Sequence, residues 1–559
     1  MFQYRVFSRT YICTLVCLML AISARAQPPI DWHLADPETS EFNGIALERL
    51  EQALGQQAGQ QEVIVAILDT GIDPDHEDLR GRIWINEDEV AGNGVDDDRN
   101  GYVDDIHGWN FLGGPNGENV VKTRLEVTRL YARDKAYFAG KDPERLSRKD
   151  RKRYEAFLEY KEVVETEREK VRTQIEQYDT NQEIILAALD AFDRQHPGQE
   201  LNAKFLQSFD PGEDQYLQIA AQIFNQAVQF GATFASTDEL RTEIIRSLDE
   251  ARESVVGKVD YWYNPDFDPE EIIGDDRTNM KERYYGNNDT ESSYAFHGTF
   301  VAGVIGARSD NEIGGRGICN NVKLMSVRML GDGDEHDKDI ANAIFYAVDN
   351  GASIINMSFG KGYTWDKKTV DKAVRYARKH DVLLVHAAGN GSINNDLEPH
   401  YPIRYFEKSG LFGKKEADNW IDVGALNLEQ GKHAIAPFSH YGKKSVDLFA
   451  PGMMIYSTAP DDSYEFSSGT SFAAPVVAGV AALIRSHFPG LTAQQVRQIL
   501  LDSATPIEGQ VIKPGTDTMV DAHELSISGG AVNAYRAYQL AAKTKGKKKG
   551  RKQGTQQRA

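Results

Sequence analysis

The strongest restriction on the fold comes from one segment of small apolar residues. Val476–Ile484 is mostly Val and Ala, with Gly479 inside it, and this composition predicts a buried helix. The segment Ser467–Ser471 lies four residues before it, and glycine at position 469 removes a side chain where another backbone must come close. Ser471 is therefore expected at the N-terminus of that helix, on the floor of a cleft. Helix N–H groups there can hold a developing negative charge.

Two further segments supply the groups that such a serine needs. A hydroxyl is a weak nucleophile, so it requires a base nearby and an acid that orients the base. Asp69 follows the apolar run Val63–Leu68, at the end of a predicted buried strand, where open α/β sheets place active groups. His297 opens another segment of small and apolar residues. A third segment, 383–390, is a predicted strand that runs into Gly389-Asn390.

The motifs DTGID, HGTFVAG, AAGN and GTSFAAP, in this order, resemble those of the subtilisin-like serine proteases. The resemblance implies a secreted serine endopeptidase in which Asp69, His297 and Ser471 form the catalytic triad. Asn390 would donate its side-chain amide to the oxyanion, together with the Ser471 N–H. The family motif has a second histidine where Phe300 stands, but that position is not the catalytic base.

The same resemblance suggests where substrate binds. Ser358-Phe359-Gly360 is similar to the family's substrate-binding edge strand, which pairs with an extended polypeptide. Asp332, Asp334, Glu335 and Asp337 crowd the loop that borders the non-primed side of the substrate in this family. Two interpretations of these carboxylates stay open: a cleft wall that favours cationic side chains, or a solvated acidic loop.

Strands and helices alternate after His297. The expected strands are 322–330, 353–357, 382–387 and 420–425, and the expected helices are 339–350 and 368–380. This alternation predicts βαβ units. The fold class is therefore α/β, a subtilisin-like parallel sheet with helices on both faces. The peptidase domain is expected over residues 62–542, after a short N-terminal segment at 27–61 that looks too short for the family's usual prodomain.

Residues 115–283 are expected to form a mostly α-helical insertion within that domain. The segment 141–177 is dense in Lys, Arg and Glu with one apolar stripe, and 184–192, 216–230 and 240–255 are further amphipathic stretches. Ser236 and Glu239 form a candidate capping box before the last stretch. The insertion could gate the cleft, dock a partner or act as a spacer.

An acidic loop after Asp69 suggests a structural calcium site. Asp96, Asp98 and Asn100, followed by glycine, match the first half of an EF-hand loop, and Tyr102 and Asp104 complete the candidate set. The bidentate glutamate of that motif is missing, so a solvated acidic turn is the alternative. No cofactor is expected for catalysis.

Residues 1–26 carry two arginines, an apolar run and Ala-Arg-Ala, which together predict a signal peptide and export to the periplasm or beyond the cell. No later segment is apolar enough to span a bilayer.

The formal net charge of −21 argues against nucleic-acid binding, and the basic tail 543–559 is expected to be disordered. Two other classes are alternatives: a catalytically silent fold used as a binding module, and a non-peptidase serine hydrolase. The order Asp, His, Ser without a G-x-S-x-G elbow argues against the latter.

Overall fold

The computed structural model describes residues 27–546, except 56, 58, 230–235, 312 and 408–413. The predicted signal peptide, and the tail beyond residue 546, lie outside the described residues. The chain forms two compact units. The α/β unit comprises Pro28–Val127 and the chain from Asp268 onward, and the helical unit spans Thr128–Phe267, a narrower range than the predicted 115–283.

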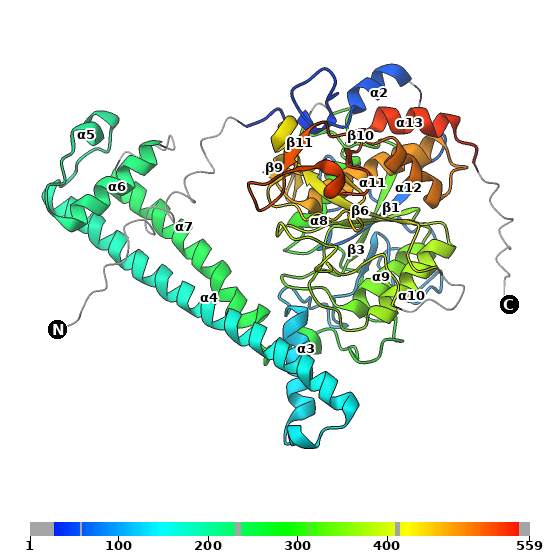
Figure 1. Ribbon diagram of the computed structural model, residues 1–559, viewed down its shortest axis with the longest axis horizontal. Coiled ribbons are helices and arrows are strands. Elements are labelled where there is room, and N and C mark those ends of the chain that lie inside the picture. Colours follow the sequence, from blue (N-terminus) through cyan, green and yellow to red (C-terminus); the bar gives the residue numbers. More distant parts are fainter. Residues whose placement is uncertain are drawn as a thin grey trace. The chain divides into compact units, whose positions relative to one another are not determined.

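The α/β unit is built on a nine-stranded sheet in the order β10-β13-β7-β6-β5-β4-β1-β3-β2 (Figure 1). All neighbouring strands in it run parallel except β10 and β13. The bounds are β1 Val63–Asp69, β2 Gly108–Asn110, β3 Val322–Arg328, β4 Ile354–Met357, β5 Leu383–Ala387, β6 Trp420–Leu426, β7 Leu448–Pro451, β10 Thr505–Pro506 and β13 Gly530–Ala531. Two antiparallel pairs lie outside the sheet, β8 Ile455–Ala459 with β9 Ser463–Ser467, and β11 Gln510–Ile512 with β12 Met519–Asp521.

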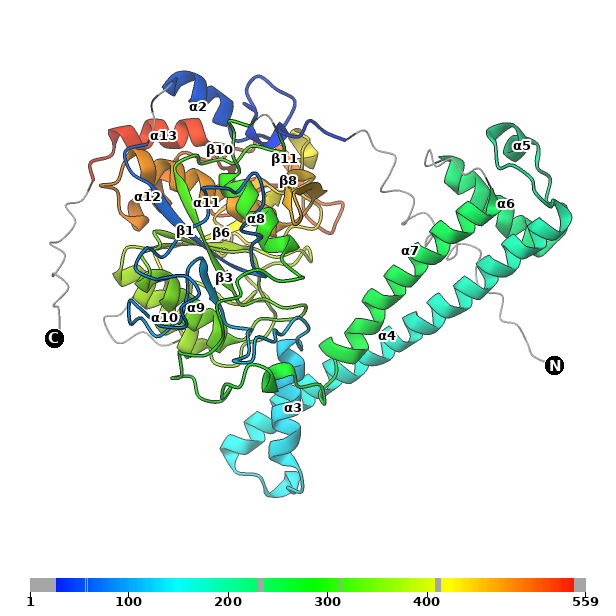
Figure 2. The same ribbon diagram turned by 180° about the vertical axis from the view of Figure 1, so that it is seen from behind.

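Helices cover both faces of this sheet, as predicted (Figure 2). The helices on one face are α2 Leu47–Leu54, α8 Phe296–Gly306, α11 Thr470–His487, α12 Ala493–Asp502 and α13 Ala534–Lys543; those on the other are α9 Asp337–Asp349 and α10 Lys367–Lys379. Strand β1 shows why two layers form. Val65 and Ile67 join the first core, whereas Ala66 and Leu68 join the second, because successive side chains of a strand point to opposite faces.

The predicted buried helix is α11, and all its residues from Phe472 to Ser486 are buried. A Cβ atom at Gly479 would lie 2.8 Å from Cβ of Ile318, so this position requires glycine for close packing. The N-terminal segment packs on the same face, where Trp32 is buried and donates its indole N–H to the carbonyl of Met454 at 2.9 Å. Among the described helices, none combines the length and the apolar composition that a bilayer crossing needs.

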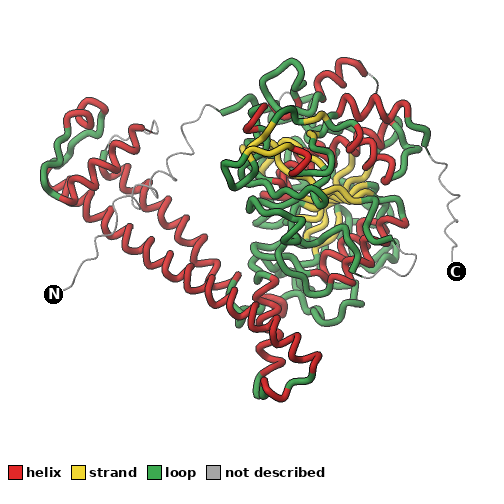
Figure 3. The backbone as a smooth tube through the Cα atoms, viewed as in Figure 1, coloured by secondary structure: helices red, strands yellow, loops and turns green. Residues whose placement is uncertain are grey.

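The helices of the second unit are α3 Glu126–Phe138, α4 Arg148–Gln195, α5 Ala203–Ser208, α6 Gln215–Gln229, α7 Thr237–Gly257 and a π-helical turn at Lys258–Trp262. Helix α4 joins two stretches, 141–177 and 184–192, that the sequence separated. Helix α7 lies beside it (Figure 3), and Leu189, Phe192, Phe224 and Leu240 share one core. The Ser236 hydroxyl accepts the Glu239 N–H at 3.2 Å, which confirms the predicted cap of α7. Short 3-10 turns occur at Trp32–Leu34, Pro143–Arg145, Pro269–Glu271, Gly431–His433 and Ala522–Glu524.

Candidate active site

Asp69 and His297 meet at the carboxyl end of the sheet. Asp69 is the last residue of β1, His297 is the second residue of α8, and Nδ1 of the imidazole lies 2.7 Å from Oδ1 of the carboxylate. The Thr70 N–H donates to the same oxygen at 2.7 Å. Glycine at position 298 permits this approach, since a Cβ atom there would lie 2.0 Å from the carbonyl oxygen of Gly71.

The local charges raise the pKa of His297. Burial by itself would lower the pKa of this imidazole, but the negative charge of Asp69 and its hydrogen bond outweigh burial. The Asp69 side chain is 1% exposed, so little water screens the pair. This pair therefore stabilises an imidazolium and fixes the orientation of the ring.

Ser471 occupies the first turn of α11, in direct contact with the predicted substrate segment. Its hydroxyl donates to the Ser358 carbonyl at 3.1 Å, and the Ser358 hydroxyl donates to the Ser471 carbonyl at 2.6 Å. The His297 and Phe472 rings lie 5.4 Å apart. The Ser471 hydroxyl has to exchange its bond to the Ser358 carbonyl for one to His297 before its proton can pass to the imidazole. Catalytic hydrogen bonds of this kind are often loose without substrate.

Phe300, which stands where the family motif has histidine, is fully buried and packs against Phe472, with the two ring centroids 4.3 Å apart. It holds the N-terminal turns of α8 and α11 together. The substitution is thus a packing feature beneath the site, as expected for a position that is not the base.

Asn390 is oriented by the residue that precedes Ser471. Its Oδ1 accepts the Thr470 N–H at 2.8 Å and the Thr470 hydroxyl at 2.9 Å, which leaves its amide N–H groups facing the other way. A Cβ atom placed on Gly469 would lie 3.5 Å from Nδ2 of Asn390 and 3.7 Å from the backbone nitrogen of Ser471. Two hydrogen-bond donors therefore converge beside Gly469.

The remaining substrate-segment residues lie directly after β4. Phe359 is buried, and the His400 ring covers Gly360 so closely that a Cβ atom there would lie 2.2 Å from it. The acidic loop nearby is engaged internally. Asp332 pairs with Lys122 at 2.6 Å, Asp334 accepts a backbone N–H, and Asp337 is buried. This loop is therefore not simply solvated, and its preference for cationic side chains of the substrate stays a prediction.

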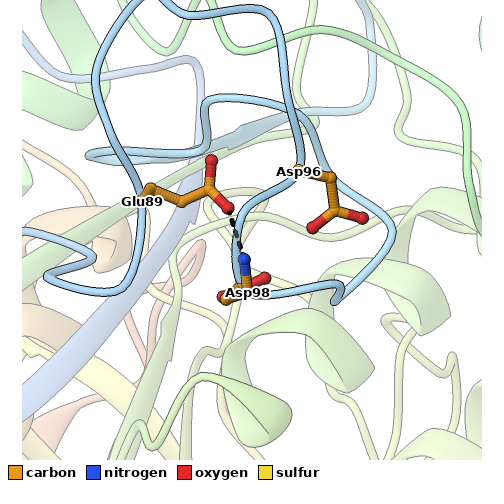
Figure 4. A group of neighbouring side chains, drawn as sticks. All are labelled: Glu89, Asp96 and Asp98. Atoms are coloured by element: carbon orange, nitrogen blue, oxygen red, sulfur yellow. Dashed lines mark hydrogen bonds between the residues drawn. The ribbon is translucent and has the colours of Figure 1, made fainter.

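The candidate calcium loop brings three carboxylates together (Figure 4). One oxygen from each of Glu89, Asp96 and Asp98 lies within 4.8 Å of the others. Glu89 also accepts the Asp98 N–H at 3.1 Å, which ties it to the loop. Hard carboxylate oxygens at this spacing fit Ca²⁺, whose charge would offset their mutual repulsion.

The other predicted ligands are used differently. The Asn100 amide donates to Asp98 at 3.0 Å, Tyr102 is buried among aromatic rings, and the Asp104 carboxylate accepts the backbone N–H groups of residues 93 and 94. Sequence reasoning missed Glu89, because it lies outside the EF-hand spacing. The only signal was the acidic run Asn86–Glu89 ahead of the loop.

Comparisons with known proteins agree with this geometry. The model of the subtilase family of peptidases matches residues 60–530. Thermophilic serine proteinase of Bacillus sp. (strain AK1) is 35% identical over 252 residues, which are 45% of this chain and 55% of that protein. Subtilisin DY of Bacillus licheniformis is 39% identical over 37% of this chain and 70% of its own length. Thermitase of Thermoactinomyces vulgaris is 34% identical over 46% and 79%.

The chain therefore belongs to the subtilase family and is a subtilisin-like serine peptidase. The predicted family and fold class are confirmed. Among solved structures, the prenylagaramide maturation protease PagA is 31% identical, with 44% of this chain and 82% of that chain covered and a TM-score of 0.36.

Proposed function

We propose that this protein is an endopeptidase that cleaves polypeptides with Asp69, His297 and Ser471 as its triad and Asn390 as its oxyanion donor. The observation that carries the proposal is the 2.7 Å contact of His297 with Asp69. The Asn390 amide and the Ser471 N–H, both beside Gly469, supply the donors for the oxyanion. Oriented base, hydroxyl and anion site are the three parts that acyl transfer requires.

In the first step, the Ser471 hydroxyl attacks the peptide carbonyl while His297 takes its proton through Nε2. Asp69 keeps Nδ1 protonated and stabilises the imidazolium. The carbonyl oxygen becomes an oxyanion and accepts the amide of Asn390 and the Ser471 N–H, which also benefits from the α11 dipole. His297 then gives its proton to the leaving amine, and an acyl-enzyme remains.

In the second step, His297 removes a proton from water, which attacks the ester carbon. The oxyanion forms in the same place, and the proton returns to Ser471 as the acid product leaves. The substrate backbone would lie along Ser358–Gly360 and pair with it as an added strand. Export of the protein and the gating or docking role of the helical insertion stay predictions from the sequence.

A serine-directed fluorophosphonate tests the proposal directly. We expect covalent labelling of the purified protein, with the adduct located on Ser471 by peptide mass spectrometry. Pre-heating above the melting temperature is the control, because labelling of a triad serine requires the folded site. An adduct on another serine, or no adduct at all on active protein, would contradict the assignment.

The raised pKa of His297 predicts the acid limb of the pH–rate profile. Only the neutral imidazole can accept the Ser471 proton, so kcat/KM should rise with pH as His297 loses its proton. The midpoint should lie above 6.5, the ordinary histidine value, because Asp69 favours the charged ring. Peptide hydrolysis measured from pH 5 to 9 gives this midpoint, with melting temperatures at each pH as the control for unfolding. A midpoint at or below 6.5 would count against the coupling.

We further propose that Ca²⁺ binds at Glu89, Asp96 and Asp98 and stabilises the fold. A ligand that binds only the native state adds about 2.7 kcal/mol at a hundredfold excess over its Kd. Melting temperatures in calcium should therefore exceed those in a chelator, and Asp98→Ala should remove most of the difference. Asp88→Ala, which changes an exposed carboxylate of the same loop outside the group, is the matched control. Equal melting temperatures in both buffers would exclude the site.

A further inference from the structure

A buried lysine follows the substrate segment directly. The side chain of Lys361 is 0% exposed, and its Nζ lies 2.8 Å from Oδ1 of Asp337 and 3.3 Å from Oε2 of Glu126. It also donates to the Glu335 carbonyl at 2.6 Å. Both carboxylate side chains are at most 2% exposed, so the three charges form one solvent-free cluster.

This cluster holds one end of the segment, and the nucleophile holds the other. At the far end, the Ser358 hydroxyl donates to the Ser471 carbonyl at 2.6 Å. At the near end, the Lys361 backbone pairs with Tyr401 through two hydrogen bonds of 2.8 and 2.9 Å. Backbone pairing fixes Lys361 relative to Tyr401, and the ammonium group fixes it relative to the acidic loop. Phe359 and Gly360 therefore span a short distance between two anchors.

The carboxylate of Asp337 stays charged in the folded state. Burial alone would raise the pKa of Asp337, but Lys361 and hydrogen bonds from Thr364 and the Asp366 N–H outweigh it, so the pKa lies below its ordinary value. Buried ion clusters often contribute no more stability than apolar residues of similar size. What such a cluster does supply is a single defined geometry, because each charge is costly in any other position.

We infer that Lys361 is a positioning residue for substrate binding: its ammonium group, held by Asp337 and Glu126, keeps Ser358–Gly360 in the extended geometry that pairs with a polypeptide. This inference rests on the proposed endopeptidase function. Glu126 is the first residue of α3, two residues before the helical unit begins, so the same contact joins the substrate segment to the entry of the insertion.

The molecule contains a matched control. Lys338 is 1% exposed, and its Nζ lies 2.6 Å from both Asp275 and Glu282. This second cluster also holds a buried ammonium group between two carboxylates, one of which, Asp275, pairs with Arg277 as well. It begins one residue from Asp337, but it is not part of the chain segment next to Ser358–Gly360. Changing either cluster would lower the stability of the protein, whereas only a change in the Lys361 cluster should affect substrate binding.

Removing one charge leaves its partners buried without compensation, so each lysine is changed together with both of its carboxylates. The test variant carries Glu126→Gln, Asp337→Asn and Lys361→Met, and the control variant carries Asp275→Asn, Glu282→Gln and Lys338→Met. The substrates are an extended tetrapeptide p-nitroanilide and p-nitrophenyl acetate, which is too short to pair with the segment.

In the test variant, we expect KM for the tetrapeptide to rise about tenfold, the scale of one lost backbone hydrogen bond. The kcat for the tetrapeptide should change less than about threefold, because the lost contact binds the substrate and the transition state equally. The rate with the acetate ester should change equally little, since this ester does not use the segment.

The control variant should keep the wild-type KM even if its melting temperature falls. An unchanged tetrapeptide KM in the folded test variant, or an equal rise in both variants, would overturn the inference. Fluorophosphonate labelling of wild-type Ser471 distinguishes failure of this inference from failure of the proposed function. Labelling requires the triad but not the pairing of a substrate with Ser358–Gly360.

Discussion

Ser471→Ala is expected to lower kcat for peptide hydrolysis by about 10⁶-fold, the scale typical of a lost triad nucleophile. Without the hydroxyl no acyl-enzyme can form, and the remaining oxyanion donors can assist only direct attack by water. The fold should persist, because the lost bond is a single hydrogen bond to the Ser358 carbonyl. Hydrolysis of a peptide p-nitroanilide, with circular dichroism and melting temperature on the same samples, measures both expectations.

Ser468→Ala is the matched control for this substitution. Ser468 lies three residues earlier in the same motif and is exposed, and its hydroxyl accepts the Met454 N–H at 2.8 Å. This variant should hydrolyse the peptide at nearly the wild-type rate and still react with the fluorophosphonate. If Ser471→Ala kept more than about 1% of the wild-type activity, this would be well above the expected residual activity. Another nucleophile would then have to be present. A preparation that is inactive with an intact Ser471 would favour the binding-module alternative.

The sequence predicted the site best where function depends on local chain geometry. Asp69 could be placed because an apolar run ends there, and His297 because small residues follow it; both residues lie at the ends of regular elements. Glycine at position 298 marks a close approach that any larger side chain would prevent. Such constraints are visible within five to seven residues of chain, so a motif carries them.

Contacts between distant segments could not be predicted in the same way. The Ser471 hydroxyl points to Ser358 rather than toward the imidazole, and this choice depends on a carbonyl that lies 113 residues away in sequence. Lys361 gives no sign in the sequence of its burial, which depends on two carboxylates from separate segments. Charged side chains are usually exposed, so the sequence favours the wrong environment for each member of this cluster.

The helical unit shows the same division. Its amphipathic stretches were visible, and the cap at Ser236 follows from local chemistry. The continuity of α4 through residues 179–183 was not predicted, because this polar stretch interrupts the apolar stripe. The helix continues since that stretch has no proline or glycine and since α6 and α7 pack on its C-terminal half.

Asn390→Ala should lower kcat by about 10² to 10³ with little change in KM. The loss is smaller than for Ser471, because the Ser471 N–H remains as an oxyanion donor. The missing amide interacts with a charge that develops only in the transition state, so binding of the ground state should be nearly unaffected. Steady-state kinetics with the same peptide separate the two constants.

Thr470→Val provides a graded variant for the same idea. The Thr470 hydroxyl is one of two groups that hold Oδ1 of Asn390, and its backbone N–H stays in place. We expect about a tenfold loss in kcat, since one neutral hydrogen bond that orients the amide is removed while the donor itself remains. A double variant, Asn390→Ala with Thr470→Val, should then be no slower than Asn390→Ala alone, because Thr470 acts through the amide. Losses that multiply in the double variant would show that Thr470 acts independently of the amide. A loss that appears in KM would show that Asn390 contributes to substrate binding instead of to the oxyanion.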